Sequence, residues 1–135
     1  TWPTVWHHDL DVPASKTFVA NFTKKYGKPP ENHAWIEYIS LKIMAQAMSE
    51  TKSTDTDKLI AYLEKETQFD ILKGRKGYFR SWDHQLMQEA YPFTVKPKGK
   101  AKDKWDTLEL GKALPGANES LEAIALTKQQ NPCTM

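Results

Sequence analysis

One predicted helix carries apolar residues on nearly every side, and this limits how the chain can fold more than any other feature. Asn32 can cap this helix, which runs to about Glu50. A helix that is apolar all round must be buried and needs neighbours on several sides. Its apolar residues are Trp35, Ile36, Tyr38, Ile39, Leu41, Ile43, Met44, Ala45, Ala47 and Met48.

Two further helices are predicted beside it. The first begins within residues 11–14 and ends at Gly27, because apolar residues recur at helical spacing up to that glycine. The other follows a polar run, and Thr54 and Asp57 have the spacing of a capping box at its start. Its apolar stripe consists of Leu59, Ile60 and Leu63.

Extended structure is predicted only in the second half of the chain. Residues 78–80 are typical of a strand, and an alternating pattern from Glu89 predicts a second, so residues 81–86 would connect a hairpin. Residues 105–110 predict a further strand, and Asn118 can cap a short last helix. These strands are few and come late, so we expect that part of the sheet covering the long helix is missing.

Composition excludes some partners. The 135 residues suffice for one modest core. Nineteen Lys and Arg against seventeen Asp and Glu give a net charge of +2, too little to indicate nucleic acid as a partner. The lysine-rich run 96–104 contains no arginine and is interpreted as a solvated loop between strands. No segment approaches the roughly 18 apolar residues that span a bilayer.

Four histidines raise a small metal-dependent hydrolase as a competing function. They are His7, His8, His33 and His84, and two histidines with a carboxylate are a familiar zinc ligand set. However, His7 and His8 would point to opposite faces of an extended strand, and no HxxxH or HExxH pair occurs. We therefore expect no metal site and no cofactor.

The dipeptide Asp83-His84 is a candidate acid–base pair, but it lacks a nucleophile. No GxSxG elbow is present, and the single cysteine, Cys133, lies near a chain end, where order is usually poor. We expect Asp83 to accept backbone hydrogen bonds in a turn instead. No catalytic residue and no enzyme activity are predicted. In an exported protein, an odd cysteine would suggest a partner outside this segment.

Taken together, the motifs of residues 14–95 resemble the C-terminal portion of type I periplasmic solute-binding proteins. These belong to the branched-chain amino acid (Leu/Ile/Val-binding) group of ABC transporters. The resemblance rests on an F-x3-F-x3-YG-x-P helix end, a helix carrying a tyrosine, a short helix with two leucines, Phe69-Asp70 before Gly74, and Gly77-Tyr78-Phe79-Arg80 followed by Asp83-His84-Gln85.

The resemblance implies an α/β, two-lobed fold that the chain crosses three times. Residues 1–12 would be an inter-lobe crossover, residues 13–76 helices of the first lobe, and residues 77–135 the hinge strand, hairpin and C-terminal helix of the second lobe. A missing N-terminal part would supply the parallel strands. The hinge signature, with a structural role, would consist of Tyr78, Phe79, Arg80, Asp83, His84 and Gln85.

The resemblance also implies a function, the solute-binding component of an ABC importer. It would work in the periplasm, capture a small carboxylate-bearing solute by closure of the lobes, and dock on a membrane permease. The solute would be a branched-chain amino acid or an aromatic acid. Ligand-binding positions implied by the resemblance are Trp6, His7, His33, Ala34, Trp35 and Tyr38.

Two alternatives stay open from the residues themselves. Trp35 and Tyr38 suit core packing as well as a binding pocket. The apolar second helix also suits a helical interaction module that docks on a partner unrelated to transport. On the solute-binding interpretation, the chain alone is expected to self-associate or to bind the missing N-terminal part, because large exposed apolar patches rarely remain unpaired.

Overall fold

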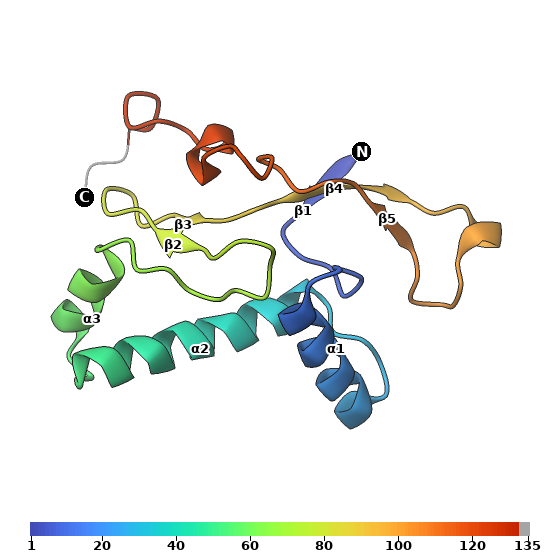
Figure 1. The fold of residues 1–135 in the computed structure, drawn as a ribbon, viewed down its shortest axis with the longest axis horizontal. Coiled ribbons are helices and arrows are strands. Elements are labelled where there is room, and N and C mark those ends of the chain that lie inside the picture. Colours follow the sequence, from blue (N-terminus) through green and yellow to red (C-terminus); the bar gives the residue numbers. More distant parts are fainter. Residues whose placement is uncertain (133–135) are drawn as a thin grey trace.

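The computed structural model describes residues 1–132, so the predictions for Cys133 lie outside the described residues. Ten elements follow one another along the chain (Figure 1). They are β1 (Trp2–Thr4), α1 (Pro13–Tyr26), α2 (Asn32–Thr51), α3 (Thr56–Leu63), β2 (Tyr78–Phe79), β3 (Leu86–Met87), β4 (Tyr91–Val95), the 3-10 helix η1 (Lys98–Lys100), β5 (Leu108–Leu110) and the 3-10 helix η2 (Leu121–Ile124).

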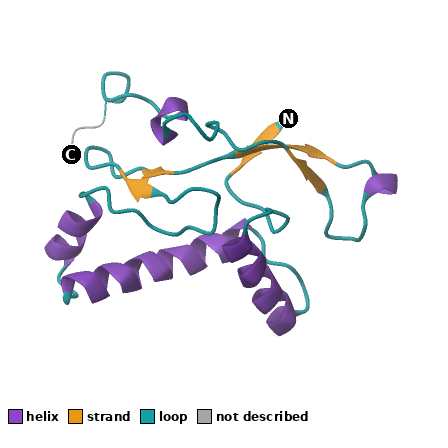
Figure 2. Cartoon of the chain, in the orientation of Figure 1, coloured by secondary structure: helices purple, strands orange, loops and turns teal. Residues whose placement is uncertain are grey.

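The three α-helices lie along one side of the molecule and the strands along the other (Figure 2). One antiparallel sheet has the order β1-β4-β5, and a second consists of β2 and β3. Trp2 pairs with Phe93 in the first sheet. The N-terminal segment is therefore fixed to a strand from the second half of the chain. None of the helices within residues 1–132 is long and apolar enough to cross a membrane.

The extents of the first two helices agree with the prediction, but the start of α2 differs. Gly27 ends α1 with φ +71°, a left-handed conformation that glycine adopts without cost, and its N–H donates to the carbonyl of Thr23. The N-cap of α2 is Glu31, without a side-chain cap. Asn32 instead donates to Thr4 Oγ1 at 2.9 Å, so a long-range contact takes the side chain that was predicted to cap.

The predicted capping box of α3 was wrong. Asp55 is its N-cap, and the Asp55 carboxylate accepts from the N–H of Lys58 at 3.1 Å. The N-cap residue predicted for the last helix was also wrong. η2 is a short 3-10 helix in which the Ser120 hydroxyl, rather than Asn118, accepts the capping hydrogen bond from Glu122. Both caps sit close to the predicted residue, where several Asx and Ser/Thr side chains compete.

The predicted hairpin exists with a different second strand. β2 pairs with β3, so that Tyr78 lies opposite Met87, and the strand that begins near Glu89 pairs with β1 and β5 instead. The reason is a tight connection in which the N–H of Arg80 donates to Gln85 and that of His84 donates to Arg80. The predicted strand 105–110 shortens to β5, because Asp103 accepts two backbone hydrogen bonds in a turn just before it.

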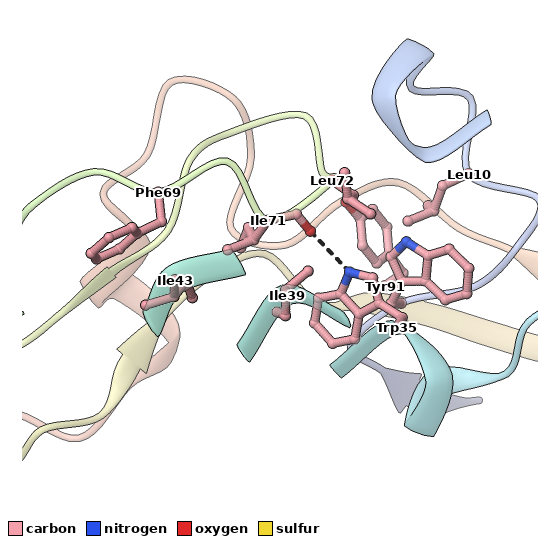
Figure 3. Close-up of a cluster of buried hydrophobic side chains, with 9 residues drawn as sticks. Leu10, Trp35, Ile39, Ile43, Phe69, Ile71, Leu72 and Tyr91 are labelled. Carbon is pink, nitrogen blue, oxygen red and sulfur yellow. Dashed lines mark hydrogen bonds between the residues drawn. The ribbon is translucent and has the colours of Figure 1, made fainter. Parts of the chain in front are cut away.

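The core lies against one face of α2. Trp35, Ile39, Ile43 and Ala47, spaced three or four residues apart, are the buried residues of this helix. Figure 3 shows three of them packed under the loop that carries Phe69, Ile71 and Leu72. The buried cluster also draws in the N-terminal segment and β4. Its members are Trp6, Leu10, Trp35, Ile39, Ile43, Phe69, Ile71, Leu72 and Tyr91.

The remaining apolar surface of α2 is exposed. Leu41 exposes 71% of its surface and Ile36 42%. Met44 and Met48 are also exposed. Burying one apolar side chain of this size contributes about 2 kcal/mol to the free energy of folding. The exposed face of α2 could therefore contribute considerably more if another element covered it. As the sequence predicts, the described elements do not enclose the span from Trp35 to Met48.

We expect the isolated chain to self-associate through this exposed face of α2. The substitution Leu41→Lys places a charge at its most exposed apolar position and should lower the mean mass measured by light scattering. The matched control is Ser40→Lys, which adds the same charge at the exposed neighbouring residue and should leave the mass of the assembly unchanged. A wild-type chain that is monomeric and unfolds cooperatively would contradict the expectation.

Candidate functional site

Two stacked tryptophans form the centre of the region in which ligand-binding residues were predicted. The rings of Trp6 and Trp35 are nearly parallel, 3° apart, with centroids 6.0 Å apart, and both side chains are fully buried. Trp35 Nε1 donates to the carbonyl of Ile71 at 2.9 Å (Figure 3). Trp35 thus takes the core position that was weighed as its alternative. Contact of either ring with a solute stays a prediction.

A groove runs beside this pair, between α1, α2 and residues 70–72. Its volume is about 710 Å³. Tyr38 stacks on Phe18 in its wall with ring centroids 4.7 Å apart. Lys42 lies 3.7 Å from the Asp70 carboxylate there, so charged groups of both signs border an aromatic surface. Aromatic walls with a few charged groups are typical of small-molecule sites.

A smaller hollow of about 270 Å³ lies on the other side of Trp6. His7, His8 and Asn32 line it. The two histidine rings stack, with centroids 4.1 Å apart, so the prediction that they point to opposite faces was wrong. The segment is not a strand here, because the N–H of Leu10 donates to the carbonyl of His7 and closes a turn. Burial lowers the pKa of His7, and the neighbouring His8 lowers it further.

The predicted ligand-binding positions do not share one pocket. Ala34 and Tyr38 line the large groove, whereas Trp6 and His7 line the smaller hollow. Trp35 lies in the core, and His33 is exposed in the first turn of α2. Four of these six positions nevertheless lie in the first two turns of α2, and Trp6 stacks on Trp35 there. The site residues therefore stay a prediction, centred on the N-terminal end of this helix.

The predicted signature around Asp83 is built around a buried arginine. Arg80 exposes 1% of its surface and donates to both oxygens of Asp83, with Nε to Oδ1 at 3.0 Å. Its other nitrogens reach Gln85, Glu122 and the carbonyl of Leu126. Asp83 also accepts from the N–H of Gln85, as the sequence predicts for a turn aspartate. Arg80 thereby ties the hairpin to the C-terminal segment.

Electrostatics support this arrangement. Burial is the largest single influence and raises the Asp83 pKa, but the hydrogen bonds from Arg80 and the Gln85 N–H and the charge of Arg80 together outweigh burial and hold this pKa below its usual range. Burial and the hydrogen bond to Glu122 raise the pKa of Tyr78 to about 12. His84, the other half of the candidate acid–base pair, turns away to Glu64 at 2.8 Å. Asp83 and His84 thus have separate partners, and the structural role of the signature residues stays a prediction.

Sequence analysis missed one buried cation. Lys73 is 6% exposed, and its Nζ lies 4.9 Å from the centre of the Trp35 ring and donates to Gln88 and the carbonyl of Glu89 at 2.6 Å. Burial lowers the Lys73 pKa to about 7, against an opposing effect of Glu89. A lysine next to Gly74 gives no signal of burial, because its partners lie fifteen or more residues away in the chain.

We expect Arg80→Met to destabilise the chain by about 3 kcal/mol, because it leaves the buried Asp83 carboxylate without its partner. Chemical unfolding measures this free energy. Lys16→Met is the control, since Lys16 and its carboxylate partner Asp11 are both exposed. The double variant Arg80→Met/Asp83→Leu should recover part of the loss. A loss no larger than that of the control would contradict the proposed clamp.

Comparisons with known proteins give consistent matches. Residues 1–101 match the family described as periplasmic binding protein. A periplasmic binding protein from Burkholderia mallei has 28% identity and a TM-score of 0.81, over 97% of this chain and 32% of its own. An ABC-type branched-chain amino acid transporter from Rhodopseudomonas palustris CGA009 has 31% identity and a TM-score of 0.70, over 83% of this chain and 29% of its own.

A third structure agrees with these. It is a branched chain amino acid ABC transporter periplasmic ligand-binding protein from Burkholderia xenovorans LB400, with 25% identity and a TM-score of 0.73 over 82% of this chain and 29% of its own. This chain therefore spans about a third of the length of the solved structures it matches. No curated protein sequence matches it.

Proposed function

This chain belongs to the periplasmic binding protein family, as its sequence predicts, and we propose from that premise that it is the C-terminal portion of the solute receptor of an ABC importer. Its fold is the corresponding part of the α/β type I periplasmic binding fold. The observation that carries the proposal is the uncovered apolar face of α2, which a second part of the same receptor would bury.

The proposed receptor acts in the periplasm and releases its solute to a membrane permease. The solute is a small carboxylate, either a branched-chain amino acid, as the names of two matched structures state for those proteins, or an aromatic acid. It is captured when two lobes close, because a solute that contacts both lobes only in the closed state shifts the equilibrium toward closure. No enzymatic step is part of this proposal.

Within this chain, we assign the solute-facing role to the N-terminal end of α2. His33 and Tyr38 are the predicted positions that are exposed on that helix, so they are the ones that a solute can reach directly. The fully buried Trp6 and Trp35 lie beneath them and hold the helix against the N-terminal segment. His7 and Ala34 flank this surface from the two neighbouring hollows.

The hydrolase alternative receives no support from the comparisons, since the matches are binding and transport proteins. In the structure, His33 and His84 lie in different elements and join no group of potential metal ligands among residues 1–132. The candidate acid–base pair is also separated, because Asp83 is held by Arg80 and His84 by Glu64.

The test is calorimetric titration of a two-lobed protein that contains this chain with L-leucine, L-valine and benzoate. We expect one of these carboxylates to bind saturably, one per protein. Tyr38→Ala or His33→Ala should weaken binding roughly tenfold, as expected for the loss of one good contact to a charged solute. His84→Ala, an exposed histidine paired with Glu64, is the matched control and should bind normally.

Two results would contradict the proposal. One is a protein that binds none of the three carboxylates. The other is turnover of a substrate by the purified protein, which would revive the enzyme alternative. Small-angle scattering adds a readout of closure, because the radius of gyration of the receptor should fall when the solute binds.

A further inference from the structure

One cluster of side chains at the edge of the proposed solute surface combines two imidazoles with a carboxylate. Within residues 1–132, His7, His8 and Asp9 are the group of His, Cys, Asp or Glu side chains whose potential ligand atoms all lie within 4.8 Å of one another. From this geometry we infer that His7, His8 and Asp9 form a binding site for a transition-metal dication such as Zn²⁺.

The distances suit zinc closely. The Asp9 carboxylate lies beside the two stacked rings, with Oδ2 at 3.5 Å from His7 Nδ1 and Oδ1 at 3.8 Å from His8 Nε2. Ligands that bind zinc tetrahedrally at about 2.0–2.1 Å are roughly 3.4 Å from one another. Both spacings therefore lie within a few tenths of an ångström of the tetrahedral edge. Asp9 is the exposed member of the three, so a small rotation of its side chain would complete the contact.

The orientation of His7 favours a cation over a simple ion pair. Its Nδ1 accepts a hydrogen bond from the N–H of Asp9 at 3.3 Å, so this nitrogen carries a lone pair and no proton. The Asp9 carboxylate lies 3.5 Å from the same nitrogen. Because an imidazole nitrogen has a single lone pair, a metal ion between these atoms would replace the long hydrogen bond from the Asp9 N–H.

The surroundings leave this cation position free. Among the described residues, the Asp9 carboxylate lies within 4 Å of a ring nitrogen of each histidine and forms no ion pair with a lysine or arginine. Lys96, the nearby cation, pairs with Asp106. A hollow of about 250 Å³ next to His8 and Asp9 is lined by two further aspartates. It has room for a water molecule as fourth ligand, and the charges of its aspartates are partly offset by Lys28 in the lining and by the pairing of Asp106 with Lys96.

The donor set selects the class of metal. Imidazole nitrogen with one carboxylate suits zinc, copper and nickel, whereas magnesium and calcium prefer shells made of oxygen. The three ligands lie in consecutive positions between Trp6 and Leu10, which are both buried in the core. A bound ion would therefore fix the turn that positions Trp6, and it should stabilise the fold, because it binds the folded chain preferentially.

Titration of the untagged 135-residue chain with Zn²⁺ tests the inference, with Mg²⁺ as the control ion. We expect one Zn²⁺ per chain by calorimetry, no binding of Mg²⁺, and a higher melting temperature with Zn²⁺. Co²⁺ should give the visible absorption of a low-coordinate site. Asp9→Asn and His8→Ala should each weaken Zn²⁺ binding by roughly tenfold or more, since changes even in outer-shell partners cost this much.

His84→Ala is the matched control, because His84 is exposed, pairs with Glu64 and belongs to no group of potential metal ligands among residues 1–132. It should bind Zn²⁺ like the unaltered chain. Asp9 is 46% exposed in its side chain, so Asp9→Asn is expected to fold normally, which circular dichroism checks. The inference is overturned if Zn²⁺ binds no better than Mg²⁺, if binding survives Asp9→Asn unchanged, or if His84→Ala removes it. None of these results bears on solute binding.

Discussion

The packing of one face of α2 against the rest of the chain is the interaction on which the other contacts depend. Trp35 on this face stacks on Trp6, donates to the carbonyl of Ile71 and lies under the Lys73 ammonium. The N-terminal segment and residues 71–73, which are far apart in the sequence, therefore meet at a single side chain. β1 adds a backbone connection, because its pairing with β4 closes the N-terminal segment over the same core.

The opposite face of α2 explains why a chain of this size does not complete a fold. Its apolar residues, Leu41 foremost, stay exposed among the described residues. The matched solved structures are about three times as long as the part that aligns with this chain. A helix that is apolar all round fits a position between two parts of a protein, and in this chain only one of those parts is present. In the hairpin, Arg80 forms hydrogen bonds to Asp83 and also to Glu122 and Leu126, and so ties the hairpin to the C-terminal segment.

The sequence predicts the helices well because their signals are local. The apolar period and Gly27 fix α1, and the long apolar run fixes α2. The predicted caps were wrong because neighbouring polar side chains compete for the same backbone N–H groups. In addition, Asn32 forms a hydrogen bond to Thr4, twenty-eight residues away. The second strand of the hairpin was predicted wrongly for a related reason. The alternating pattern of β4 is real, but β1 and β5 take this strand as their partner, and no local pattern encodes that choice.

The sequence indicates the region of the chain in which the candidate sites lie, but not the contacts between their side chains. Core packing was one of the two interpretations given for Trp35, and its side chain is buried in the structure. Apolar periodicity supports this interpretation because it indicates which side of a helix faces the core. By contrast, the approach of His7 to His8 depends on a turn closed by Leu10, which the sequence gives no reason to expect in place of a strand. The burial of Lys73 likewise depends on Gln88 and Glu89, which approach it only in the folded chain.

Methionine oxidation tests the central claim, that the exposed face of α2 is buried by another part of the same protein. Met44 and Met48 lie on this face, whereas Met87 is 2% exposed and serves as an internal control. In the dilute isolated chain, peroxide should oxidise Met44 and Met48 quickly and Met87 slowly. In a two-lobed protein that contains this chain, Met44 and Met48 should become as protected as Met87. Equal reactivity of Met44 and Met48 in both proteins would contradict the account.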